Sequence, residues 1–211
     1  MSSALIVWGG WDGHEPEPVA NILAEALRDE GFEVEVSDTL EAFEDEEKLR
    51  GLDLIVPQWT MGEIAKEQLE PVLAAVESGV GIAGLHGGMG DAFRQSTQWQ
   101  FMVGGQWVAH PGGADITYEV KIVSDDPIVA GIEDFEVTSE QYYMHVDPNN
   151  EVLAVTYFSD WGDAPMPVVW KKSWGEGRVF YSSLGHNAEI AAQEEPLEIM
   201  TRGMKWAARA L

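Results

Sequence analysis

The five histidines of the chain share one sequence context: each lies in a turn marked by glycine, proline or asparagine, and most follow an apolar run. They are His14, His86, His110, His145 and His186. Histidine ionises near neutral pH and is the commonest metal ligand in proteins. In α/β sheets, ligands bind at strand ends and in the loops after them. This shared context therefore predicts one polar site that contains at least three of the five histidines. The alternative is that tolerant loop positions collect polar residues.

His86 lies within GLHGG at 84–88, directly after an apolar run. A strand-to-helix turn flanked by glycines is typical of a nucleophile elbow, which exposes its central side chain above the sheet. A histidine at that point can act as an acid, a base, a ligand or a hydrogen-bond donor. Gly87 and Gly88 would allow close backbone approach. The other interpretation is a glycine-rich packing turn with an incidental histidine.

Three further segments carry chemistry-bearing residues. His186 ends the last predicted core strand, much as His86 ends an earlier one. In EQYYMH at 140–145, strand period places the even-numbered residues on one face and the odd-numbered ones on the other, so that half of them belong to the core. Glu140 is the carboxylate of this segment. His110 precedes a proline, which limits it to extended conformations.

Nine tryptophans are many for 211 residues, and several fall near strand ends. Trp11 and Trp107 are the two tryptophans that lie nearest to a histidine in the sequence. Aromatic faces beside carboxylates and imidazoles are typical of sugar recognition, although any single tryptophan is more often part of the core. The first glycine-rich turn, at 8–15, is neither GxGxxG nor a phosphate loop.

A metal site is the other chemistry that these residues allow. No HExxH, EF-hand or P-loop pattern is present. Three or more histidines with a carboxylate could bind Zn²⁺ or another divalent cation. The wide separation of the histidines in sequence leaves open whether the cluster would hold a metal or transfer a proton.

Composition excludes several classes. Thirty-seven acidic and twelve basic residues give a net charge of −25, which repels nucleic acid and anionic membranes. The acids are dispersed, which suggests adaptation to high salt. The absence of cysteine excludes disulfides, thiolate ligands and a cysteine nucleophile. We find no run of 18 apolar residues and no signal-peptide pattern, so a cytoplasmic location is expected.

The elements that must position these residues can be predicted from periodicity. In the first half, strands are expected at 4–8, 32–36, 52–57 and 80–85, and helices at 18–30, 42–49 and 63–78. In the second half, helices are expected at 99–103 and 196–211, and strands at 116–122, 135–138, 152–158, 166–172 and 178–183, the last two joined by a hairpin turn at 173–177. This pattern predicts a single α/β domain over 1–211, with a doubly wound, mainly parallel sheet and a β-rich antiparallel extension.

Five motifs together resemble the ThuA-like (trehalose-utilisation) family, which has the flavodoxin-like fold of class I glutamine amidotransferases. They are GGWDGHEP at 9–16, GLHGGMGDAF at 84–93, GGQWVAHPGG at 104–113, SEQYYMHVDP at 139–148 and GEGRVFYSSLGHN at 175–187. In amidotransferases a cysteine stands at the elbow and a later histidine activates it. His86 and His186 stand at those two positions here. Without cysteine, glutamine hydrolysis through a thioester is excluded.

The resemblance implies catabolism of trehalose or a related disaccharide, through 3-keto derivatives made by a partner sugar dehydrogenase. Our first hypothesis is an enzyme in which His86 and His186 exchange protons and Glu140 is a second acid/base or a hydroxyl ligand. The expected substrate-binding residues are His14, His110, His145, Trp11, Trp107, Gly87 and Gly88. A non-catalytic sugar-binding module and a metal-dependent hydrolase, with zinc as the possible cofactor, remain alternatives. We expect a homo-oligomer with a small-molecule sugar substrate and no nucleic-acid or membrane partner.

Overall fold

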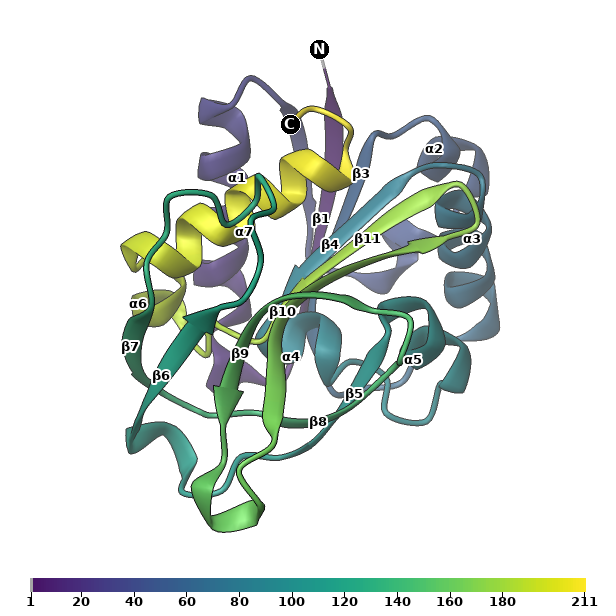
Figure 1. Cartoon of the computed structure of the whole chain (residues 1–211). Helices are drawn as coiled ribbons and strands as arrows, with labels where there is room; N and C mark the ends of the chain where they lie inside the picture. Colours follow the sequence, from purple (N-terminus) through teal and green to yellow (C-terminus); the bar gives the residue numbers. More distant parts are fainter. Residues whose placement is uncertain (1) are drawn as a thin grey trace.

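Nine strands form one mixed sheet at the centre of the computed structural model, which describes residues 2–211 (Figure 1). The strand order is β2-β1-β3-β4-β11-β10-β9-β6-β7. The parallel half consists of β1 (Ser3–Gly10), β2 (Glu33–Ser37), β3 (Leu54–Thr60), β4 (Gly81–Leu85) and β11 (Gly177–Ser182). The antiparallel half consists of β6 (Ile116–Ile122), β7 (Phe135–Ser139), β9 (Glu151–Tyr157) and β10 (Pro165–Trp174). The prediction of a flavodoxin-like sheet with an antiparallel extension is confirmed.

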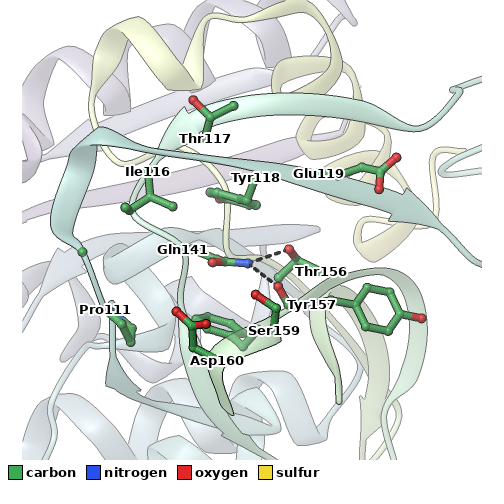
Figure 2. Close-up of a pocket in the computed structure, with 12 residues that line it drawn as sticks. Pro111, Ile116, Thr117, Tyr118, Glu119, Gln141, Thr156, Tyr157, Ser159 and Asp160 are labelled. Atoms are coloured by element: carbon green, nitrogen blue, oxygen red, sulfur yellow. Dashed lines mark hydrogen bonds between the residues drawn. The ribbon is translucent and has the colours of Figure 1, made fainter. Parts of the chain in front are cut away.

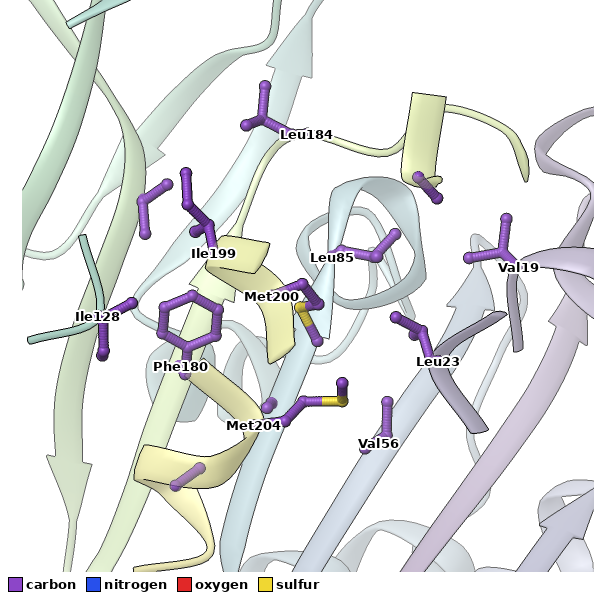
Figure 3. Packing of buried hydrophobic residues seen from close by; sticks show 14 of the residues in the cluster. Val19, Leu23, Val56, Leu85, Ile128, Phe180, Leu184, Ile199, Met200 and Met204 are labelled. Carbon is purple, nitrogen blue, oxygen red and sulfur yellow. The ribbon is translucent and has the colours of Figure 1, made fainter. Parts of the chain in front are cut away.

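Helices cover both faces of the parallel half (Figure 1). One face carries α1 (Pro16–Asp29), α6 (Ala188–Ala191) and α7 (Glu194–Ala207), and the other carries α2 (Glu46–Arg50), α3 (Lys66–Glu77) and α5 (Thr97–Val103). Alternate residues of β1 face the two layers: Ala4 and Ile6 pack into the first core, and Leu5 and Val7 into the second. A strand buried on both faces must be apolar throughout, and this explains its continuous apolar run. Figure 3 shows the first core, where Met200 and Met204 of α7 lie near Leu85 and Val56.

The last hairpin forms as predicted. Trp174 of β10 pairs with Gly177 of β11, and Gly175 in the turn has a φ of 58°, a conformation that glycine adopts readily. β11 lies between β4 and β10, parallel to the first and antiparallel to the second. The hairpin therefore joins the two halves of the sheet.

Two regions differ from the expected elements. The acidic helix expected at 42–49 is a 3₁₀ turn at Leu40–Phe43 followed by α2, because the side chain of Asp45 accepts from Lys48 N and begins a new helix there. β5 (Gly105–Ala109) and β8 (Tyr143–Val146) were not expected; they pair with each other in a separate two-stranded sheet. The strand period applied to 140–145 served only to sort its side chains by face. Each of the two segments becomes a strand by pairing with the other, which is distant in sequence.

The remaining elements are short: α4 (His86–Gly90) and the 3₁₀ turns at Asp12–His14, Gly113–Asp115 and Ser159–Trp161. Within residues 2–211, no helix has both the length and the apolar character needed to cross a bilayer.

Candidate functional site

The turn between β4 and α4 positions His86. Leu85 ends the strand and His86 begins the helix with a φ of 48°, in the left-handed region that costs a non-glycine residue about 1 kcal/mol or more. The side chain is 1% exposed. The turn thus has the backbone form of an elbow, and the imidazole that it presents is buried beneath other side chains.

Glu140 lies at the centre of the site, just after β7. Its Oε2 is 3.1 Å from His86 Nε2, 3.4 Å from His186 Nδ1 and 3.7 Å from His14 Nε2. Its other oxygen, Oε1, is 3.7 Å from His110 Nε2. The structure therefore brings four of the five histidines around one buried carboxylate.

Two of these rings are oriented by a second contact on the opposite nitrogen. His86 Nδ1 is 2.8 Å from the carbonyl oxygen of Ser183. Because a carbonyl only accepts, Nδ1 carries the proton and donates it. His14 Nδ1 is 2.9 Å from the hydroxyl of Thr60, at the end of β3. Both rings therefore point Nε2 at Glu140, in the arrangement that orients metal-binding histidines in proteins.

Burial and contacts set the charges of this group. Burial lowers the pKa of His86 to about 4, against the opposing effect of the nearby Glu140 carboxylate, so the ring is neutral near pH 7. Burial also acts to raise the pKa of Glu140, but the contacts with His14, His186 and His86 outweigh it and leave that pKa well below its usual range. A carboxylate therefore faces the lone pair of a neutral imidazole.

Four side chains form a possible metal-ligand group. His14, His86, Glu140 and His186 each offer one ligand atom, and these atoms lie within 4.8 Å of one another. His186 Nδ1 is buried and has no hydrogen-bond partner among the described residues. Three imidazole nitrogens with one carboxylate oxygen are a ligand set that Zn²⁺ accepts.

The glycines of the elbow serve the packing of the site. A Cβ at Gly87 would lie 2.6 Å from His14 Nδ1, and one at Gly88 would lie 2.3 Å from Gln58 Oε1. Both glycines are buried. The absence of a Cβ at these two positions therefore lets His14 and Gln58 approach the elbow closely, and a role of the two glycines in substrate binding stays a prediction.

Aromatic rings form the walls around the histidines. Tyr142 stacks on His86 with ring centroids 4.0 Å apart, and Trp107 lies 5.5 Å from His110. Trp11 meets the ring of His14 edge-on at 4.8 Å and is 46% exposed, so part of its face is open to a ligand. Sequence reasoning did not single out Tyr142, although its place on the Glu140 face of 140–145 was a usable signal.

His145 lies apart from the other histidines. It belongs to β8, opposite Gln106 of β5, and its side chain is exposed beside Phe101 and Gly105. The neighbouring Met144 is buried in the core, and strand alternation turns His145 the other way. The expectation that His145 lines the shared pocket is therefore corrected.

Fold and site together define a class: a flavodoxin-like α/β protein with a buried histidine–carboxylate cluster at the carboxyl ends of its parallel strands. The family model for ThuA, described as trehalose utilisation, matches residues 3–207. The chain belongs to the ThuA family, and at the level of that family it belongs to carbohydrate metabolism.

Solved structures share the fold at low sequence identity. A ThuA-like protein from Parabacteroides merdae superposes with a TM-score of 0.78 at 17% identity, over 98% of this chain and 90% of that one. One from Bacteroides uniformis has a TM-score of 0.77 at 18% identity, over 98% and 91%. A cytoplasmic protein from Salmonella typhimurium has a TM-score of 0.69 at 14% identity, over 98% and 99%. No curated protein matches by sequence.

Proposed function

We propose that the chain is a metal-dependent enzyme of carbohydrate metabolism, with a divalent cation held by Glu140, His14, His86 and His186. Of the hypotheses that the sequence left open, this one has the strongest geometric support. The family description supports a sugar as the substrate.

One observation carries the proposal: His86 Nε2 lies 3.1 Å from Glu140 Oε2. The proton of His86 is on Nδ1, where it bonds to Ser183 O, so the atoms that face each other are both electron-pair donors. Such a pair is repulsive in a buried site unless an electrophile lies between them. The low pKa of His86 disfavours a second proton on the ring, and a cation satisfies both atoms.

The same facts argue against His86 as a proton carrier. A catalytic base works best with a pKa near the operating pH, whereas that of His86 is about 4. His110 suits proton transfer better, because its side chain is 37% exposed and contacts the second oxygen of Glu140. We therefore assign His86 to the metal and His110 to the movement of a proton between the site and solvent.

A bound divalent cation supplies Lewis acidity toward a carbonyl or hydroxyl oxygen, or lowers the pKa of a water. A keto sugar offers both a carbonyl and neighbouring hydroxyls, and a sugar dehydrogenase is the class of enzyme that would supply it. Trp11 provides a partly open aromatic face for the ring.

The proposal is tested by the metal content of the purified protein and by turnover of a keto-disaccharide before and after treatment with a chelator. We expect about one Zn²⁺ or Mn²⁺ per chain, loss of turnover on chelation, and recovery on adding the metal. His86→Gln should lose the metal, whereas His145→Gln, which changes the histidine outside the cluster, should keep it. A metal-free protein that turns over sugar in the presence of chelator would contradict the proposal.

A further inference from the structure

The sheet splits near the candidate site. β6 and β9 pair at Lys121–Val155 and Ile122–Ala154 and then diverge toward Ile116 and Tyr157. Between the diverging ends lies a cavity of about 510 Å³ (Figure 2), which is within the usual size range of small-molecule sites. We call it the wedge; it is lined by residues 111–112, 116–119, 141 and 156–160.

Both polar groups and aromatic rings line the wedge. Glu119, Asp160 and Ser159 contribute oxygens, and Tyr118 and Tyr157 contribute rings (Figure 2). Along this stretch the facing edges of the two strands carry backbone N–H and C=O groups that do not pair across the gap, and such groups are ready to bind a ligand. The wedge thus combines hydrogen-bonding groups with flat apolar surface.

The side-chain amide of Gln141 lies in the middle of the wedge and is fixed there by hydrogen bonds. Gln141 Nε2 donates to the hydroxyl of Thr156 at 2.8 Å and to the carbonyl of Tyr157 at 3.1 Å, bridging from the segment after β7 to β9 (Figure 2). Both amide hydrogens are used, so the side chain is fixed in place. The lining is therefore preorganised and does not have to form around a ligand.

The wedge adjoins the metal-ligand group through two segments. Gln141 follows Glu140, and Pro111 follows His110. Tyr118, in the wedge, also donates its hydroxyl to the carbonyl of Glu140 at 3.3 Å.

The wedge opens at the edge of the sheet where the metal-ligand group lies. Tyr157 pairs with Pro165 at the start of β10, and Ser182, four residues before His186, pairs with Val169 of the same strand. The end of β9 therefore lies toward the edge from which the histidines project.

From these contacts we infer that the wedge is a second subsite, which binds an uncharged sugar ring linked to the ring held at the metal-ligand group. This inference rests on the proposed function and makes the substrate a disaccharide. None of the described residues that line the wedge is a lysine or an arginine. Lys121, beside the wedge, is paired with Glu119 at 3.2 Å, and the carboxylate of Asp160 disfavours anionic groups such as phosphate. Carboxylates accept strong hydrogen bonds from hydroxyls, and aromatic faces pack on the apolar side of a ring.

The test compares the binding of trehalose, a two-ring sugar, with that of glucose by calorimetry. Wild-type protein should bind trehalose about ten-fold more tightly than glucose. Tyr157→Ala, which removes a ring that is 42% exposed, should abolish that difference and leave glucose binding unchanged. Phe101→Ala removes another exposed ring, one outside the wedge, and should behave as wild type.

Equal affinity for the two sugars in wild type, or an equal loss of both in Tyr157→Ala, would overturn the inference. Metal content is measured on the same samples and separates the two proposals. Tyr157→Ala should keep its metal, and a wild-type protein that prefers trehalose but contains no metal would contradict the proposed function alone.

Discussion

At the scale of single residues, the two carboxylate oxygens of Glu140 lie in different environments. Oε2 faces the buried imidazoles of His14 and His86 and the largely buried one of His186, and Oε1 faces His110, which solvent reaches. One oxygen is thus suited to a metal and the other to a proton that moves. The chain has no cysteine, and the elbow presents the imidazole of His86 in place of a thiol.

Thr60 gives a residue-scale prediction. Thr60→Val should weaken zinc binding by about 10- to 100-fold, because His14 loses the partner that orients its ring. Competition with a chromophoric chelator measures the affinity. Thr117→Val, which removes a hydroxyl paired with Thr138 on an exposed strand, is the matched control and should bind zinc as wild type does. Equal affinity in Thr60→Val would show that the hydroxyl has no orienting role.

The individual site residues could be predicted from the sequence, but which of them lie together in space could not. His86 and His186 were marked by strand ends in the sequence, and Glu140 by being the carboxylate of 140–145. Glu140 and His86 are nevertheless 54 positions apart, and no local pattern indicates their contact. Thr60 carries no sequence signal beyond its place after an apolar run. His145 resembles the others in sequence and differs only because β8, which was not expected, turns it outward.

At the scale of elements, the β4–α4 turn fits tightly between β3 and the segment that carries His14. Gly87→Ala should destabilise the protein by about 1–3 kcal/mol and reduce zinc binding, because the new methyl group would press on His14 Nδ1. Urea unfolding and metal titration measure the two effects. Gly51→Ala, at an ordinary φ near the end of α2, should change neither. A Gly87→Ala protein with full zinc affinity would contradict the packing argument.

Elements were predictable where periodicity was long, as in α1, α7 and the buried strands. The strands β6, β7, β9, β10 and β11 were also predicted from the sequence. The order in which these strands join was not predictable in the same way, because pairing such as that of β6 with β9 is decided by tertiary contacts. The wedge arises from that pairing and has no signature in the sequence.

At the scale of the whole molecule, a net charge of −25 dominates the surface. The free energy of unfolding should rise as KCl is raised from about 0.1 to 1 M, because the screening length falls from about 10 to 3 Å and self-repulsion weakens. Urea unfolding at each KCl concentration measures this free energy. Replacing Glu41 and Glu47 with glutamine should raise stability at low salt and flatten the dependence. An unchanged slope in that variant would rule out carboxylate repulsion as the cause.

The position of β11 has a consequence for how the chain is made. All four strands of the antiparallel half reach the parallel half through this one strand, which is translated after every other strand of the sheet. A ribosome-bound chain can begin to pair β1 to β4, but no strand of one half can pair with the other half until β11, which ends at residue 182, has left the exit tunnel. His186 follows four residues later, so the ligand group is complete only in a fully closed sheet. Metal uptake would then report the closure of the sheet and discriminate against truncated products.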